Sequence, residues 1–189
     1  MNETLMTQTE PSVGSAIPET PAEARSKAVL YVGMVLGVII ADQITKWVVL
    51  RTLRLYDPVP VLGDFFRLTF IYNRGAAFGI HVGGWSRIVF MLLAVVATIA
   101  LGMMYRSTPW RDRVRLIAIA GVTGGAIGNL IDRVRSSRGV IDFLDFGLGG
   151  VRWPVFNVAD IFVTCGALVL AFSLWREEQQ VERGKDASR

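Results

Sequence analysis

The feature that most constrains the fold is a run of 21 residues, VFNVADIFVTCGALVLAFSLW, from Val155 to Trp175. It contains no lysine or arginine and is long enough to cross the roughly 30 Å apolar core of a bilayer as a helix, at about 1.5 Å per residue. Yet Asn157 and Asp160 lie in its first turns. A charged carboxylate in a membrane helix costs on the order of 2.5 kcal/mol or more, so we expect Asp160 to have a specific role.

Composition places the whole chain among multi-pass membrane proteins. Of its 189 residues, 52% are hydrophobic, and the mean hydropathy is +0.43, whereas soluble domains are about 45–50% apolar. The apolar residues gather in four runs, each near the ~20 residues of a crossing once its flanks are included. These runs span residues 28–50, 88–104, 116–131 and 155–175. We therefore expect an all-α membrane protein with four transmembrane helices.

The segments outside these runs predict two polar tails around a membrane domain at residues 28–175. Residues 1–27 hold three prolines and four glutamates without an apolar run, which is typical of a disordered segment. Residues 176–189 form a charged, solvated tail. Arg25 and Lys27 resemble the start of a secretory signal, but the run that follows lacks a suitable cleavage site and is expected to remain as an anchor.

Basic residues predict the orientation of the chain. The segment RSTPWRDRVR, residues 106–115, is the densest basic connection, and the positive-inside rule places it in the cytoplasm. With four crossings, both tails are then cytoplasmic, and residues 50–87 and 139–153 lie outside. Nearly all unusual polar residues of the spans gather at that outer face. The net charge of +4 does not indicate a nucleic-acid partner, because the arginines fall at span ends rather than in one patch.

The first outer connection predicts β-structure. In the segment FRLTFIYN, residues 66–73, apolar and polar side chains alternate, as in a half-buried strand. The segment VIDFLDF, residues 140–146, repeats the pattern. We expect a small extracytoplasmic β-sheet with a short loop helix. In the third span, glycines recur at positions 121, 124, 125 and 128; because they allow close helix approach, they predict that this span lies at the centre of the bundle.

Two sets of polar residues share helix faces. Asn129, Asp132 and Arg133 are three or four residues apart, and Asp42 lies one turn from Lys46. Either set can be an ion pair or helix cap near the headgroups, or can take part in chemistry. The sequence alone leaves both readings open.

Asp142 and Asp160 remain as candidates for acid–base chemistry, since both lie at the outer face. At a separation of about 4 Å, their repulsion would be roughly 4 kcal/mol, or about three pKa units. One carboxyl would stay protonated at neutral pH, which gives an acid and base pair able to activate water. The pair would titrate as a unit.

Other chemistries lack their residues. The chain has one histidine, His81, and one cysteine, Cys165, so neither a zinc site nor the H-E-x-x-H motif of metallopeptidases is expected. The G-x-S-x-G nucleophile motif is absent. A serine and lysine pair would have to use Lys46 with Ser86, and no surrounding pattern supports it. No cofactor is expected.

Five motifs in sequence resemble those of bacterial lipoprotein signal peptidase, also called signal peptidase II. They are DQITK (Asp42 to Lys46), NRGAAF (Asn73 to Phe78), GNLIDR (Gly128 to Arg133), VIDF (Val140 to Phe143) and FNVAD (Phe156 to Asp160). The resemblance covers about residues 28–175. It implies a four-helix aspartic peptidase of the bacterial inner membrane that removes the signal peptide of lipid-modified prolipoproteins before the diacylglyceryl-cysteine.

The resemblance also implies roles for individual residues. Asp142 and Asp160 match the catalytic pair. Positions that bind substrate or support the site are matched by Asp42, Lys46, Asn73, Gly75, Asn129, Asp132, Arg133 and Asn157. Prolipoproteins and membrane lipid are the expected partners, and we expect a monomer without a metal. The main rival is a proton-coupled transporter, because membrane carboxylates often carry protons, and a non-catalytic scaffold is a third possibility.

Overall fold

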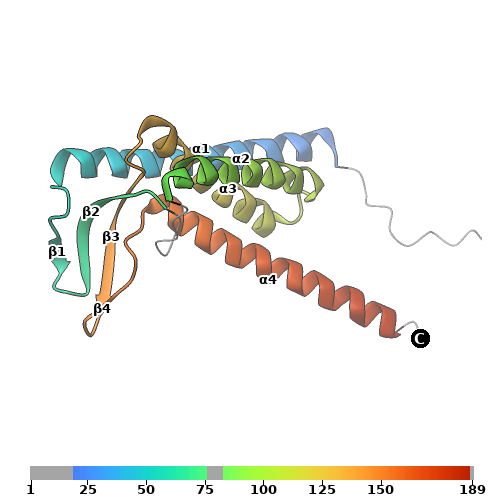
Figure 1. Cartoon of the computed structure of the whole chain (residues 1–189). Coiled ribbons are helices and arrows are strands. Elements are labelled where there is room, and N and C mark those ends of the chain that lie inside the picture. The colour runs from blue at the N-terminus through green and yellow to red at the C-terminus, as the bar shows by residue number, and fades with distance from the viewer. Residues whose placement is uncertain (1–18, 76–82, 188–189) are drawn as a thin grey trace, which may run out of the picture.

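The computed structural model describes residues 19–75 and 83–187. Figure 1 shows the long helices with a small sheet at one end. In chain order the elements are α1 (Pro21–Thr52), β1 (Val59–Leu62), β2 (Phe66–Asn73), the 3₁₀ helix η2 (Gly83–Trp85), α2 (Ser86–Ser107), α3 (Arg113–Arg135), β3 (Val140–Leu148), β4 (Val151–Arg152) and α4 (Val158–Ala187). All four α-helices are long and apolar enough to cross a membrane. The predicted fold class is confirmed, including the sheet and the short loop helix.

Two helices extend into segments that we expected to be tails. Helix α1 begins at Pro21 because Thr20 and Glu23 form a reciprocal capping box, in which each side chain accepts the other's backbone N–H. Residues 1–18 lie outside the described residues. At the other end, α4 continues to Ala187, since REEQQVER is rich in strong helix formers and contains no proline.

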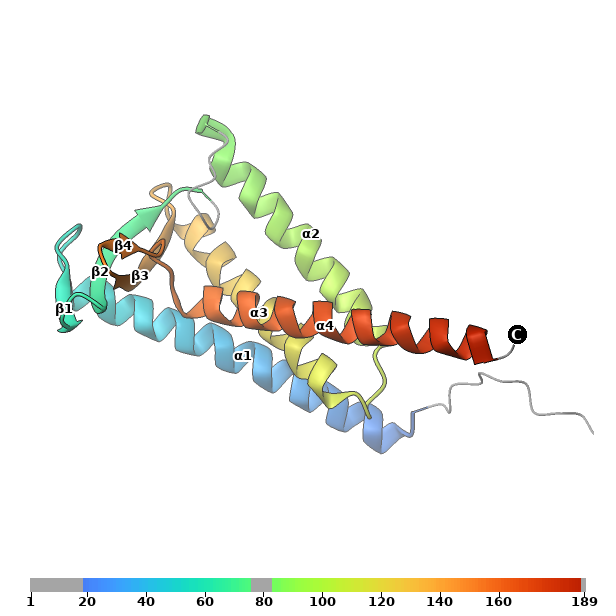
Figure 2. The same cartoon turned by 90° about the horizontal axis from the view of Figure 1, so that it is seen from below.

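Helix α3 lies between the other helices. It contacts α1, α2 and α4 (Figure 2), and its buried residues include Gly121, Gly124, Gly125 and Gly128. A Cβ on Gly125 would come within 2.5 Å of the Ala159 carbonyl oxygen, and one on Gly128 within 2.7 Å of Asp42 Oδ2. The central position predicted for the third span is therefore confirmed, and its glycines allow α4 and the side chains of α1 to approach its backbone.

The sheet is antiparallel, with strand order β1-β2-β3-β4. It stands at the end of the bundle where α1 and α3 end and α4 begins (Figures 1 and 2). Its inner face buries Phe70, Ile141 and Phe143 against Val49 of α1. The helix ends that carry the unusual polar residues therefore meet beneath the sheet, as expected from the number of crossings.

The segment that enters α4 is attached to β3 by backbone hydrogen bonds. Leu144 N donates to Phe156 O at 2.8 Å, and Phe156 N donates to Leu144 O at 3.1 Å. This short bridge places Asp142 of β3 beside Asn157 and Asp160, although 15 residues separate Asp142 from Asn157.

The close contact at Gly125 is testable by adding one methyl group. We expect Gly125→Ala to lower the free energy of unfolding by about 1–3 kcal/mol, because the methyl would press on the α4 backbone and on Val163. Gly102→Ala in α2 is the matched control, since a Cβ there meets nothing within 4 Å. Thermal unfolding in detergent would measure both variants. An unchanged midpoint for Gly125→Ala would contradict the close packing of α3 on α4.

Candidate active site

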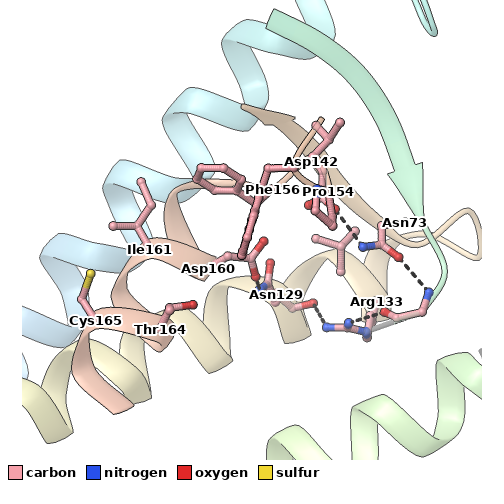
Figure 3. A pocket seen from close by; sticks show the side chains of 14 residues that line it. Asn73, Asn129, Arg133, Asp142, Pro154, Phe156, Asp160, Ile161, Thr164 and Cys165 are labelled. Carbon is pink, nitrogen blue, oxygen red and sulfur yellow. Dashed lines mark hydrogen bonds between the residues drawn. The ribbon is translucent and has the colours of Figure 1, made fainter. Parts of the chain in front are cut away.

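A cavity of about 320 Å³ lies where β2, β3, α3 and the start of α4 meet (Figure 3). Its polar wall contains two carboxylates, Asp142 and Asp160, together with Asn73, Asn129 and Arg133. Its apolar wall is formed by the chain that enters α4 and by the first turns of that helix: Trp153, Pro154, Val155, Phe156, Ile161 and Cys165. The cavity therefore brings two acids together at the border of an apolar surface.

Asp142 is held from two sides. It lies in β3 opposite Ile71 of β2, and its side chain is almost completely buried, with 1% of the residue exposed. Asn73 Nδ2 donates to Oδ2 at 2.9 Å, and Asn157 Nδ2 donates to Oδ1 at 2.7 Å. Both oxygens thus have a neutral amide donor, which fixes the plane of the carboxyl group.

Asp160 belongs to the cap of α4. Asn157 Oδ1 accepts from Asp160 N at 3.0 Å, and Asp160 Oδ2 accepts from Asn157 N at 3.1 Å. This is the reciprocal arrangement of a capping box, in which the two residues satisfy each other's free backbone N–H at the helix start. Asp160 Oδ1 accepts from Asn129 Nδ2 at 2.8 Å.

Asn157 therefore joins the two acids. Its side-chain oxygen accepts from the backbone of Asp160, and its amide group donates to Asp142 and, at 3.1 Å, to Asn129 Oδ1. The residue is fully buried. Because one rigid amide contacts both acid-bearing segments, rotation of its side chain would disturb both carboxylates at once.

Asn129 connects Asn157 and the two acids to a buried cation. Its oxygen accepts from Lys46 Nζ at 3.0 Å. Lys46 also donates to Asp42 Oδ2 and to Asp132 Oδ2, both at 2.8 Å, and only 2% of its side chain is exposed. Its three N–H groups thus have three acceptors. Removing one partner from such a buried ion group typically costs about 3–5 kcal/mol.

The two carboxylates around Lys46 also accept from backbone groups of other elements. Asp42 Oδ1 accepts from Ala159 N in the first turn of α4 at 3.0 Å, and Asp132 Oδ2 accepts from Ile141 N of β3 at 3.2 Å. Gln43 Nε2 donates to both acids. The group therefore fixes α1, α3, α4 and β3 relative to one another.

Arg133 lies on the side of the cavity that faces α2. It donates to Gly75 O at 3.1 Å and to Asn129 O at 3.3 Å, and its guanidinium lies 5.6 Å from the ring centre of Phe90. Asn73 Oδ1 accepts from Gly75 N at 2.9 Å, which turns the end of β2 toward the cavity. Arg133 thus adds positive charge close to the acids without forming a direct ion pair with either.

The environment of Asp142 changes its acidity. Burial first, and then the negative charge of Asp160, raise the pKa of Asp142 from 3.8 to about 7, while the hydrogen bonds from Asn73 and Asn157 act in the opposite direction. Asp145 in the same strand differs. Although burial raises its pKa, the bonds and charges of its neighbours lower it more, so that the pKa of Asp145 lies below its usual value. Of these two carboxyl groups of β3, the one that lines the cavity has its pKa near neutral pH.

The ten predicted site residues fall into two groups. Six line the cavity: Asn73, Gly75, Asn129, Arg133, Asp142 and Asp160. Four lie behind it and hold it: Asp42, Lys46, Asp132 and Asn157. The ion-pair reading is confirmed for Asp42 with Lys46, and Asp132 also pairs with Lys46 rather than with its helix neighbour Arg133. The same contacts hold the elements that carry the two acids. Lys46 directs its N–H groups to Asp42, Asp132 and Asn129, which argues against its pairing with Ser86.

Sequence reasoning missed Gln43 and Thr164. Gln43 follows Asp42 directly, and no spacing rule marks it as a partner of Asp132; Thr164 lines the cavity one turn beyond Asp160. No group of three or more His, Cys, Asp or Glu within residues 19–75 and 83–187 is placed to hold a metal. His81 and the end of the NRGAAF motif lie outside the described residues.

Comparison with known families identifies the family of this chain. The family described as signal peptidase (SPase) II matches residues 34–176. The chain belongs to the signal peptidase II family. A curated lipoprotein signal peptidase of Burkholderia mallei (strain SAVP1) is 43% identical over 144 residues, which cover 75% of this chain and 85% of that protein. One of Halothermothrix orenii is 41% identical over 146 residues, covering 77% and 95%.

Solved structures support the fold of this signal peptidase II family member. A bacterial membrane enzyme at 2.3 Å resolution aligns with a TM-score of 0.72 and 30% identity, covering 79% of this chain and 90% of that one. A second, at 1.9 Å, aligns with a TM-score of 0.67 and 31% identity, covering 76% and 91%. The chain is therefore a multi-pass membrane protein of a peptidase family.

The raised pKa of Asp142 predicts how stability depends on pH. Between pH 4 and pH 7 the folded protein holds a proton here that the unfolded chain has lost, so this residue makes the free energy of unfolding fall as the pH rises. A shift from 3.8 to about 7 corresponds to a few kcal/mol at most. We expect Asp142→Asn to reduce that loss, as measured by thermal unfolding in detergent from pH 4 to pH 8.

Asp64→Asn is the matched control, because the Asp64 side chain is fully exposed. It should keep the pH dependence of the unmodified protein. If Asp142→Asn and Asp64→Asn gave the same slope, Asp142 would titrate like an ordinary surface carboxylate, and the electrostatic description of the cavity would be wrong.

Proposed function

We propose that the chain is an aspartyl endopeptidase that removes signal peptides from diacylglyceryl-modified prolipoproteins by cutting immediately before the lipidated cysteine. The observation that carries this proposal is the joining of Asp142 and Asp160 through Asn157 in one cavity. The lipoprotein signal peptidases among its relatives support the substrate class. The two acids in one cavity support the peptidase chemistry.

In the proposed reaction the two acids take different parts. Asp142, with its pKa near 7, carries the shared proton, and Asp160 is ionised. Asp160 accepts a proton from a water molecule, whose oxygen attacks the carbonyl carbon of the scissile amide, while Asp142 gives its proton to the carbonyl oxygen. The tetrahedral intermediate then collapses. The C–N bond breaks, the amine leaves with a proton from Asp160, and Asp142 recovers its own from the new carboxyl group.

The surrounding residues keep this geometry. Asn129 and Asn157 donate to the acids and hold each in one orientation. Arg133 supplies a positive charge beside the cavity, which favours the negative charge that develops on the carbonyl oxygen. Because these groups are oriented before substrate arrives, little reorganisation is needed during the reaction.

The position of the cavity suits a substrate that stays in the membrane. Ile161 and Cys165 line the cavity and are exposed on the outer surface of α4. A lipid-anchored peptide can therefore reach the acids from the side, with its acyl chains in hydrocarbon and its scissile bond at the polar end. In this proposal the site faces the outer side of the inner membrane, both termini are cytoplasmic, and the enzyme acts as a monomer without a metal or other cofactor.

A proton-coupled transporter fits the geometry less well. Transporters usually place their ionisable groups near the middle of the membrane between repeated halves. Here one acid lies in strand β3 and the other in the first turn of α4, and these two elements meet at one end of the bundle (Figure 1). Nothing in the part of the chain that the structure describes favours transport specifically.

The proposal predicts that both acids are needed for cleavage and not for folding. We expect Asp142→Asn and Asp160→Asn each to reduce kcat by on the order of 10³-fold or more, because each removes a proton-transfer step. The assay uses a purified lipid-modified prolipoprotein in detergent and separates the products by mass. Asp64→Asn is the control and should cleave normally, since its side chain is fully exposed.

Folding of each variant is checked by size-exclusion chromatography and thermal unfolding. Folded variants that still cleave at the normal rate would disprove the role of the pair. Loss of folding in both would instead favour a scaffold whose acids only cap helices.

A further inference from the structure

Thr164 carries a hydroxyl group in the wall of the cavity, beyond its polar end. It lies on α4 four residues beyond Asp160, which is about 6 Å deeper into the membrane at 1.5 Å per residue. Its side chain lines the cavity and is exposed (Figure 3). The neighbouring lining residues on α4, Ile161 and Cys165, offer no oxygen or nitrogen in their side chains. Thr164 is thus a polar group in the apolar part of the wall.

The other threonines that the structure describes use their hydroxyl groups within the protein. Within residues 19–75 and 83–187, the other threonine hydroxyls donate to a backbone carbonyl or a carboxylate: Thr20, Thr45, Thr52, Thr69, Thr98, Thr108 and Thr123. In a membrane helix the usual acceptor is the carbonyl four residues earlier. For Thr164 the structure gives no such bond among the described residues, so its hydroxyl is available to a molecule in the cavity.

A donor at this depth needs an acceptor that is polar but embedded in lipid. In the proposed substrate, the peptide bond lies at the acids, and the acyl chains lie in hydrocarbon. Between them are the two glycerol ester groups, whose carbonyl oxygens accept hydrogen bonds and cannot donate. The nearer ester carbonyl oxygen is eight covalent bonds from the scissile nitrogen, and this flexible linkage, which runs through the cysteine side chain and the glycerol, can span one turn of helix.

We propose that the Thr164 hydroxyl donates a hydrogen bond to an ester carbonyl of the diacylglyceryl group and thereby sets the preference for an ester-linked lipid. This inference rests on the proposed function. Thr164 acts here as a positioning and specificity residue, because its hydroxyl touches a part of the substrate remote from the bond that breaks. We therefore expect removal of this hydroxyl group to raise KM and to leave kcat nearly unchanged.

The test compares two substrates that differ only in the lipid linkage. One is a signal peptide whose cysteine carries a diacylglyceryl group, and the other carries the dialkyl ether analogue, which lacks both carbonyl oxygens. Thr164→Val keeps the shape of the side chain and removes the donor, while Thr164→Ser keeps the donor. Thr98→Val in α2 is the matched control, because that hydroxyl donates to Ala94 O within its own helix.

With the ester substrate we expect Thr164→Val to raise KM roughly three- to tenfold, the effect of one hydrogen bond, with kcat nearly unchanged. Thr164→Ser, which keeps the donor, should have the KM of the unmodified protein. With the ether substrate, the unmodified protein and Thr164→Val should have the same KM. Thr98→Val should behave like the unmodified protein with both substrates.

Two results would overturn the inference while leaving the proposed function intact: an unchanged KM for the ester substrate in Thr164→Val, or an equal rise for both substrates. An equal rise would show that Thr164→Val raises KM by changing the contact with the peptide or the shape of the helix, and not by removing a bond to an ester. If the unmodified protein cut neither lipidated peptide, the proposed function itself would fail, and this inference with it.

Discussion

The structure of the site depends on one buried cation. Lys46 has three N–H groups and three acceptors, on α1 and α3. Its partners use their other bonds to hold further elements: Asp42 accepts from the start of α4, and Asp132 accepts from β3. Because lipid cannot hydrate a charge, these groups are stable only together, and any helix that moved away would leave a buried charge unpaired. The same ion group therefore aligns every element that carries a proposed catalytic residue.

The second constraint is the start of α4. A helix begins with free N–H groups, and in a membrane these need protein partners. Asn157 and Asp160 satisfy each other's backbone groups, while their remaining bonds reach Asp142 and Asn129. A capping arrangement that any helix could use thus also presents two carboxyl groups to one cavity. This explains why structural and chemical interpretations of these residues could not be separated in the sequence.

Much of the architecture could be predicted because periodicity and length are local properties. The four spans, the strand alternation of residues 66–73 and the central glycine-rich helix follow from them. The polar residues could be placed at one end of the bundle because four alternating crossings bring the ends of the first and third spans and the start of the fourth to the same face. The roles of Asp142 and Asp160 were favoured by elimination and by the resemblance to a family, and they remain a proposal.

What could not be predicted depends on backbone groups and on contacts between distant elements. The bonds from Ala159 N and Ile141 N to acids on other helices leave no mark in residue type or spacing. The bridge from Leu144 to Phe156, which sets the distance between β3 and α4, is also made by backbone atoms. The unused hydroxyl of Thr164 becomes visible only when the bonds of the other threonines are known.

The central claim is that Asp142 and Asp160 lie close enough to share one proton at neutral pH. Infrared spectroscopy of the purified protein, with Asp142→Asn subtracted, measures the protonated carboxyl band directly. We predict a band that disappears around pH 7 in the unmodified protein and at lower pH in Asp160→Asn, where the neighbouring charge is gone. A band that disappears near pH 4 in both proteins would show two independent carboxylates and would contradict this account.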